Sequence, residues 1–77
     1  MPNQRVDVTV HIDEELDSAR TTEVCELLRH HDGVFNVRCA EHKKHLLVVE
    51  YDPASITSGD ILQQIKGQGL HGELVGL

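Results

Sequence analysis

Residues 35–53 read FNVRCAEHKKHLLVVEYDP, which is two apolar runs on either side of a charged turn. In the first run apolar and polar side chains alternate, the period expected of a β-strand with one buried face. The face that we expect to be buried in the two runs carries Phe35, Val37, Cys39, Leu47, Val49 and Tyr51. Pro53 ends the second run because proline has no N–H to donate to a neighbouring strand. The stretch therefore predicts a β-hairpin with its turn at residues 40–45.

A strand and a helix are predicted before the hairpin. Residues 5–12, RVDVTVHI, alternate strictly between polar and apolar side chains and indicate a half-buried strand. An acidic loop, residues 13–17, follows this strand. Apolar residues then recur at helical spacing, which predicts a helix over residues 18–31 with Asp17 or Ser18 as its N-cap.

A second helix and a last strand are predicted after the hairpin. Thr57 stands three residues before Asp60, a spacing like that of a capping box, and the aliphatic residues that follow repeat at helical spacing. Gly67 and Gly69 end this helix. Residues 71–77 form a short, weakly patterned strand that we expect at an edge of the sheet.

The order strand, helix, strand, strand, helix, strand over residues 1–77 predicts one α+β domain, a ferredoxin-like β-α-β-β-α-β sandwich. In this architecture both helices cover one face of a four-stranded antiparallel sheet. The other face of the sheet is then mostly polar, with Leu46 and Val48 as its apolar exceptions.

Composition argues against several classes of function. Thirteen acidic residues against seven basic residues give a net charge of −6, which repels phosphate backbones, so no nucleic-acid partner is expected. The chain has no apolar run as long as a membrane span and no basic, then apolar, leader, so we expect a cytoplasmic protein with no membrane partner. It also lacks a recognisable order of catalytic residues and a glycine-rich phosphate loop, so an enzyme is not expected.

The two cysteines, Cys25 and Cys39, are too few for a disulfide scaffold. Their separation of 14 residues fits neither a thiol redox motif nor a zinc knuckle. We therefore expect free thiols that pack in or beside the core as small apolar side chains.

Three segments resemble the heavy-metal-associated domain of copper chaperones and metal-pumping P-type ATPases. They are HHDGVFNVRC at 30–39, VVEYDP at 48–53 and SITSGDILQQIKGQGL at 55–70. The matching positions are Gly33, Val34, Val37, Cys39, Val49, Tyr51, Asp52, Pro53, Ile61, Leu62, Ile65 and Gly69. The resemblance covers nearly the whole chain. It implies the family's fold, a role in metal ion binding or transport, and a metal transporter or another protein as the partner.

The family's metal-binding motif, M-x-C-x-x-C, is missing from this sequence. In the family its two thiolates hold a soft ion such as Cu(I). Counted back from Gly33 without a gap, the two cysteine places fall on Asp17 and Arg20, and the methionine place falls on Glu15. Leu70 stands where the family has an aromatic or lysine residue, and it offers no hydrogen bond. Because an anion and a cation cannot replace two thiolates, we do not expect the Cu(I) mechanism here.

A different set of donors converges at the same end of the predicted fold, where the loops 13–17, 40–45 and 67–71 emerge together. The candidate metal ligands are His42, His45, His71, Glu15 and Asp17, with His11 nearby. Imidazole with carboxylate suits Zn(II), Ni(II), Co(II) or Cu(II). The same residues also fit a simpler interpretation, in which the loop side chains are solvated and the acidic ones complement the dipole of the first helix.

The alternative function is a metal-free protein-interaction or regulatory module on the same scaffold. The acidic loop would then attract a basic patch on a partner protein. The open face of the sheet or its edge would offer a surface for a homodimer. The residues expected on these interaction surfaces are Asp13, Glu14, Glu15, Leu46 and Val48.

Overall fold

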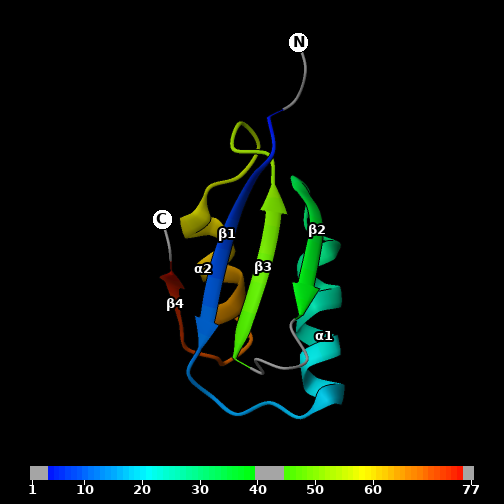
Figure 1. Cartoon of the computed structure of the whole chain (residues 1–77), viewed down its shortest axis with the longest axis vertical. Coiled ribbons are helices and arrows are strands. Elements are labelled where there is room, and N and C mark those ends of the chain that lie inside the picture. Colours follow the sequence, from blue (N-terminus) through cyan, green and yellow to red (C-terminus); the bar gives the residue numbers. More distant parts are fainter. Residues whose placement is uncertain (1–3, 40–44, 76–77) are drawn as a thin grey trace.

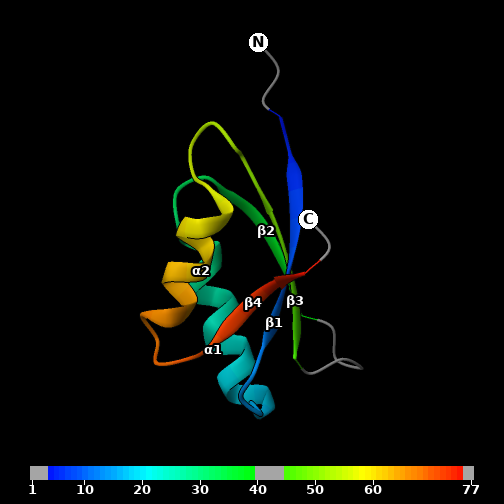
Figure 2. The same ribbon diagram turned by 90° about the vertical axis from the view of Figure 1, so that its left-hand side faces the viewer.

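The computed structural model describes residues 4–39 and 45–75, and their elements follow the predicted order. The elements are β1 (Val6–Ile12), α1 (Ser18–Arg29), β2 (Val34–Cys39), β3 (Leu46–Tyr51), α2 (Ser58–Lys66) and β4 (Gly72–Val75). The four strands form one antiparallel sheet in the order β2-β3-β1-β4, and both helices lie against one face of it (Figures 1 and 2). The ferredoxin-like architecture is therefore confirmed, as is the edge position of β4. Neither of these helices is long and apolar enough to cross a membrane.

Both helices begin where the sequence predicts. The carboxylate of Asp17 caps α1 by accepting the N–H of Arg20 at 2.7 Å. Thr57 and Asp60 form the capping box of α2, each side chain accepting the other residue's backbone N–H. Helix α1 ends at Arg29, two residues earlier than predicted, because the chain tightens into a turn toward a glycine with a left-handed backbone.

The core lies between the sheet and the helices. Alternation along β3, and along β1 from Val8 onward, sends every second side chain into it, as the sequence predicts. Val6, expected on the same face as Val8, is instead 37% exposed at the start of β1. The buried core residues are Val8, Val10, Ile12, Leu16, Val24, Cys25, Leu28, Val37, Leu47, Val49, Tyr51, Ile56, Ile61, Ile65 and Leu70. Leu70, at the family's aromatic or lysine position, is thus a core residue with 7% of its surface exposed.

Phe35 was predicted on the buried face of the hairpin, and this prediction is wrong. The register of β2 on β3 shifts between Val34 and Asn36, so that two residues of β2 face Glu50. Such a bulge turns the extra side chain away from the core. Phe35 is 38% exposed, and the guanidinium of Arg5 lies 4.5 Å from the centre of its ring.

The expectation of free thiols is also wrong, since Cys25 and Cys39 form a disulfide between α1 and β2. Their expected position is confirmed: Cys25 is part of the core, and Cys39 packs against it. The two residues are 14 apart in sequence, but the return of β2 alongside α1 brings their Cα atoms within 6.9 Å.

Candidate functional site

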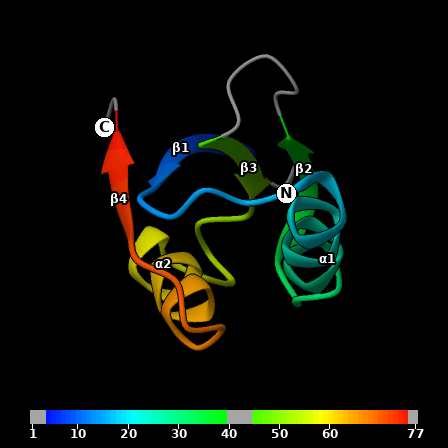
Figure 3. The same ribbon diagram turned by 90° about the horizontal axis from the view of Figure 1, so that it is seen from below.

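The β1–α1 connection, the α2–β4 connection and the start of β3 meet at the end of the sheet where α1 begins (Figure 3), as predicted for these described residues. The N–H of Asp13 donates to the carbonyl of His71 at 2.8 Å, joining the β1–α1 and α2–β4 connections. The N–H of Ile12 donates to the carbonyl of His45 at 2.7 Å, joining β1 to the start of β3. His42 lies outside the described residues.

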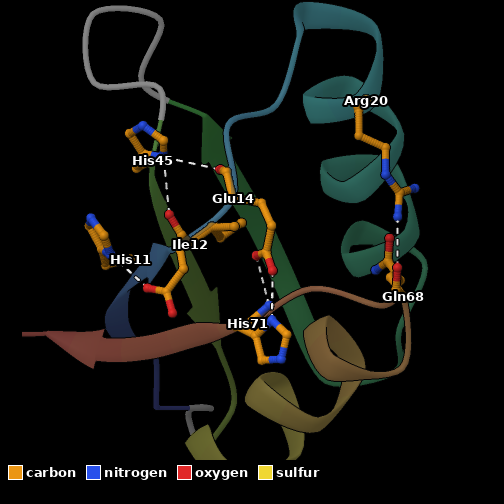
Figure 4. Close-up of polar contacts among 8 residues, drawn as sticks. His11, Ile12, Glu14, Arg20, His45, Gln68 and His71 are labelled. Atoms are coloured by element: carbon orange, nitrogen blue, oxygen red, sulfur yellow. Dashed lines mark hydrogen bonds and ion pairs between the residues drawn. The ribbon is translucent and has the colours of Figure 1, made fainter.

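The imidazole of His45 is held by backbone carbonyls. Its Nδ1 lies 3.0 Å from the carbonyl oxygen of Ile12 and 3.1 Å from that of Glu14 (Figure 4). A carbonyl only accepts hydrogen bonds, so Nδ1 carries the proton. In the neutral ring Nε2 is then the unprotonated nitrogen, which is the atom that binds metals or accepts protons. The ring of His11 stacks beside that of His45, with centroids 5.7 Å apart.

Glu14 holds His71 through both carboxylate oxygens. Oε1 accepts the backbone N–H of His71 at 2.8 Å, and Oε2 lies 2.6 Å from Nδ1 of its ring. The backbone and side-chain hydrogen bonds from His71 lower the pKa of Glu14. The hydrogen bond and charge of Glu14, helped by Asp13 and opposed by Lys66, raise the pKa of His71. Both residues are therefore charged over part of the acidic range.

The Glu14–His71 pair makes a testable prediction about pH. The raised pKa of His71 stabilises the folded state. This stabilisation is fully present below the ordinary histidine pKa of 6.5 and is lost as pH rises through the pKa of His71 in the folded protein. The lowered pKa of Glu14 also stabilises the folded state. This stabilisation is fully present above the ordinary glutamate pKa of 4.5 and is lost as pH falls through the pKa of Glu14 in the folded protein. The contact is therefore strongest between pH 4.5 and 6.5. Because His71 is largely exposed, its effect on stability is small, and NMR titration of its ring is the sensitive measurement.

We expect His71 to titrate above 6.5 in the natural chain and to return toward 6.5 in Glu14→Gln. Glu15→Gln is the matched control, since Glu15 is the next residue and should leave the titration of His71 unchanged. A His71 pKa that does not respond to Glu14→Gln would contradict the ion pair.

Asp17 and Arg20, the positions matched to the family's cysteines, both have structural partners. Asp17 is the N-cap of α1. Arg20 forms an ion pair with Glu23, and its Nη2 donates to the carbonyl oxygen of Gln68 at 2.9 Å (Figure 4). The first turn of α1 is thus tied to the α2–β4 connection by a guanidinium.

A hollow of about 420 Å³ opens beside the start of α1, lined by Glu15, Leu16, Asp17 and His45. It gathers three of the five predicted metal ligands. His71 is not among its lining residues, and its ring is paired with Glu14 instead. Within residues 4–39 and 45–75, no three side chains of His, Cys, Asp or Glu are already arranged around one point as a metal site.

The predicted interaction residues fall on two surfaces. Asp13 and Glu15 are exposed on the β1–α1 connection, whereas Glu14 is half-buried in its contact with His71. Leu46 and Val48 are half-buried on the face of the sheet that the helices leave open, opposite His11 and Thr9 in the register of β1.

Sequence reasoning missed the acceptors that organise this end of the molecule, which are backbone carbonyls of Ile12, Glu14 and Gln68. A backbone carbonyl is present at every residue, so no residue type signals it. The partnership of Glu14 with His71 left a weak signal, an acidic residue on one loop and a histidine on a loop at the same end.

No protein-family model and no curated protein sequence matches this chain. Solved structures do match it in fold. A copper-binding domain from HMA7, a P-type ATPase, is 23% identical, with 95% of this chain and 96% of that chain covered and a TM-score of 0.84. Oxidized MerP from Ralstonia metallidurans CH34 is 18% identical, with 95% and 100% covered and a TM-score of 0.85.

The yeast copper transporter domain CCC2A is 23% identical over 95% of this chain and 97% of that chain, with a TM-score of 0.81. The matched domains have nearly the same length as this chain, and each match covers 95% of it. This chain therefore has the fold of the heavy-metal-associated domain.

Proposed function

We propose that the chain is a metal-handling module that binds a borderline divalent ion through imidazole and carboxylate, in place of Cu(I) through two thiolates. The observation that carries this proposal is the hydrogen bonding of His45. Metal-binding histidines generally donate one ring N–H to a carbonyl or carboxylate, which orients the ring and leaves the other nitrogen to bind the ion. His45 has this arrangement, with Nδ1 directed to Ile12 and Glu14.

The hollow beside the start of α1 supplies carboxylates to the same place. Glu15 is exposed and forms no hydrogen bond or ion pair with another described residue. Oδ1 of Asp17 accepts the backbone N–H of Arg20 in the N-cap of α1, which leaves Oδ2 to coordinate an ion. Since these groups are not yet at ligand distances from one point, the proposal requires Glu15 and Asp17 to turn toward Nε2 of His45 when an ion binds. Nitrogen and oxygen donors of this kind suit Zn(II), Ni(II) or Cu(II).

The partner proposed for this module is a metal transporter. The matched structures include domains described as parts of a P-type ATPase, a potential copper-translocating P-type ATPase and a yeast copper transporter. The acidic β1–α1 connection would attract a basic surface on such a partner.

Calorimetric titration with Zn(II), Ni(II) and Cu(II) at neutral pH tests the proposal. We expect one saturable site with micromolar or tighter affinity for at least one of these ions. Loss of a group that only orients a ligand commonly costs about 10- to 100-fold in affinity, so His45→Ala, which removes a ligand, should weaken binding by at least about 10-fold. His30→Ala is the matched control, because His30 is a largely exposed residue at the opposite end of α1. Absence of one-site binding, or an equal loss in both variants, would refute the His45 site.

A metal-free docking module is the second candidate, and the contacts of Arg20 favour it. Arg20 bonds to Gln68 and Glu14 bonds to His71, so α1 and the β1–α1 connection are already linked to the α2–β4 connection without an ion. A surface fixed in this way is preorganised for a partner, which reduces the entropy lost on binding. Titrations that show no ion binding, together with recovery of a transporter fragment whose binding weakens with salt, would favour this candidate over the first.

A further inference from the structure

The disulfide between Cys25 and Cys39 joins the buried face of α1 to the end of β2. The two cysteine residues differ in exposure. Cys25 is 1% exposed, whereas Cys39 is half-buried on an edge strand and is the last residue of that strand. Cys39 is therefore the more exposed side of the bond, and we expect a dissolved thiol to approach from there.

We propose that Cys25–Cys39 is a reversible thiol–disulfide site that exchanges with low-molecular-weight thiols through Cys39. In the reducing direction a thiolate attacks Sγ of Cys39 and forms a mixed disulfide there, and Sγ of Cys25 leaves with the electron pair of the broken bond and takes a proton. A second thiolate attacks the sulfur of the small molecule, releasing its symmetrical disulfide and the Cys39 thiolate. In the oxidising direction a small-molecule disulfide accepts the two electrons by the same steps in reverse.

The bond acts on the part of the fold next to the site. Cys39 ends β2 and lies six residues before His45 in the sequence. Closing the bond fixes that end of β2 to α1. Helix α1 begins at Ser18, directly after Asp17, which lines the hollow. Reduction removes this link and leaves the end of β2 held by its pairing with β3, Cys39 against Leu47, and by the donation of Arg29 to the carbonyl of Val37 at 2.7 Å.

Mass spectrometry and thermal unfolding in glutathione buffers test the proposal with the whole chain. In oxidised glutathione we expect no free cysteine thiol in the chain. In excess reduced glutathione we expect two free cysteine thiols. Cross-links that close loops of this length commonly stabilise small domains, so reduction should lower the midpoint of thermal unfolding by about 10–20 °C. Two free thiols under oxidising conditions in the folded protein would overturn the proposal.

Single variants separate the roles of the two sulfurs. In oxidised glutathione, Cys25→Ser should accept one glutathione at the accessible Cys39 without denaturant. Cys39→Ser should accept glutathione at the buried Cys25 only when urea unfolds the chain. Equal modification of both folded variants would overturn the assignment of Cys39 as the entry point. Circular dichroism establishes that each variant is folded, and if one is not, the wild-type mixed disulfide is located by peptide mapping instead.

Discussion

Gly33→Ala is expected to lower the free energy of unfolding by about 2–4 kcal/mol. Gly33 has a φ of +92°, a backbone region that costs residues with a Cβ atom about 1–2 kcal/mol. An added Cβ would also overlap Cγ2 of the buried Ile56 and lie 2.9 Å from Cβ of Ser55. Neither neighbour can retreat easily, because the Asp52 N–H holds this turn to the carbonyl of Gly33 at 2.8 Å.

Urea denaturation of the wild type and the variant measures this loss. Gly59→Ala is the matched control: Gly59 lies within α2, and a Cβ there would meet only Thr57 Oγ1, at an ordinary 3.6 Å. Since alanine is a better helix former than glycine by up to about 1 kcal/mol, the control should be neutral or stabilising. A loss below about 1 kcal/mol for Gly33→Ala would mean that the turn rearranges around the new methyl group.

The fold was predictable because its signals are local. The alternation of residues 5–12 placed Val8, Val10 and Ile12 in the core, and the spacing of Thr57 and Asp60 marked the start of α2. Phe35 was misplaced because a bulge depends on how β2 pairs with β3, which is a property of two strands and not of one run of residues. Once shifted outward, the ring contacts the guanidinium of Arg5, which precedes β1 at the same end of the sheet.

The same distinction separates the predictable part of the site from the rest. Topology brings the loops of His45, His71 and Asp17 to one end, so their convergence followed from the order of elements. Which side chains form hydrogen bonds there depends on the positions of backbone carbonyls. The order of residues in the sequence does not give these positions. The disulfide was missed for a related reason, since a separation of 14 residues matches no local motif.

Restoring the missing thiolates is the second experiment with a large expected effect. Asp17→Cys combined with Arg20→Cys is expected to bind Cu(I) at least about 100-fold more tightly than the natural chain, because two thiolates are the soft donors that Cu(I) prefers. Asp17 is the N-cap of α1 and Arg20 lies three residues later, a spacing that places both side chains on the same side of the helix. A helix N-terminus also lowers the pKa of a thiol and so favours the thiolate.

Competition with a Cu(I)-specific chelator under reducing conditions measures the gain, and the two single variants are its controls. One thiolate at either position cannot form a two-coordinate site, so each single variant should bind close to the wild-type level. The substitution also removes the cap of α1 and the bond from Arg20 to Gln68, so circular dichroism must first show that the helix persists. If the folded double variant binds no more tightly than the single ones, Asp17 and Arg20 do not stand where the family's cysteine pair stands. The ungapped count from Gly33, and with it the proposal that imidazole and carboxylate take the place of two thiolates here, would then be wrong.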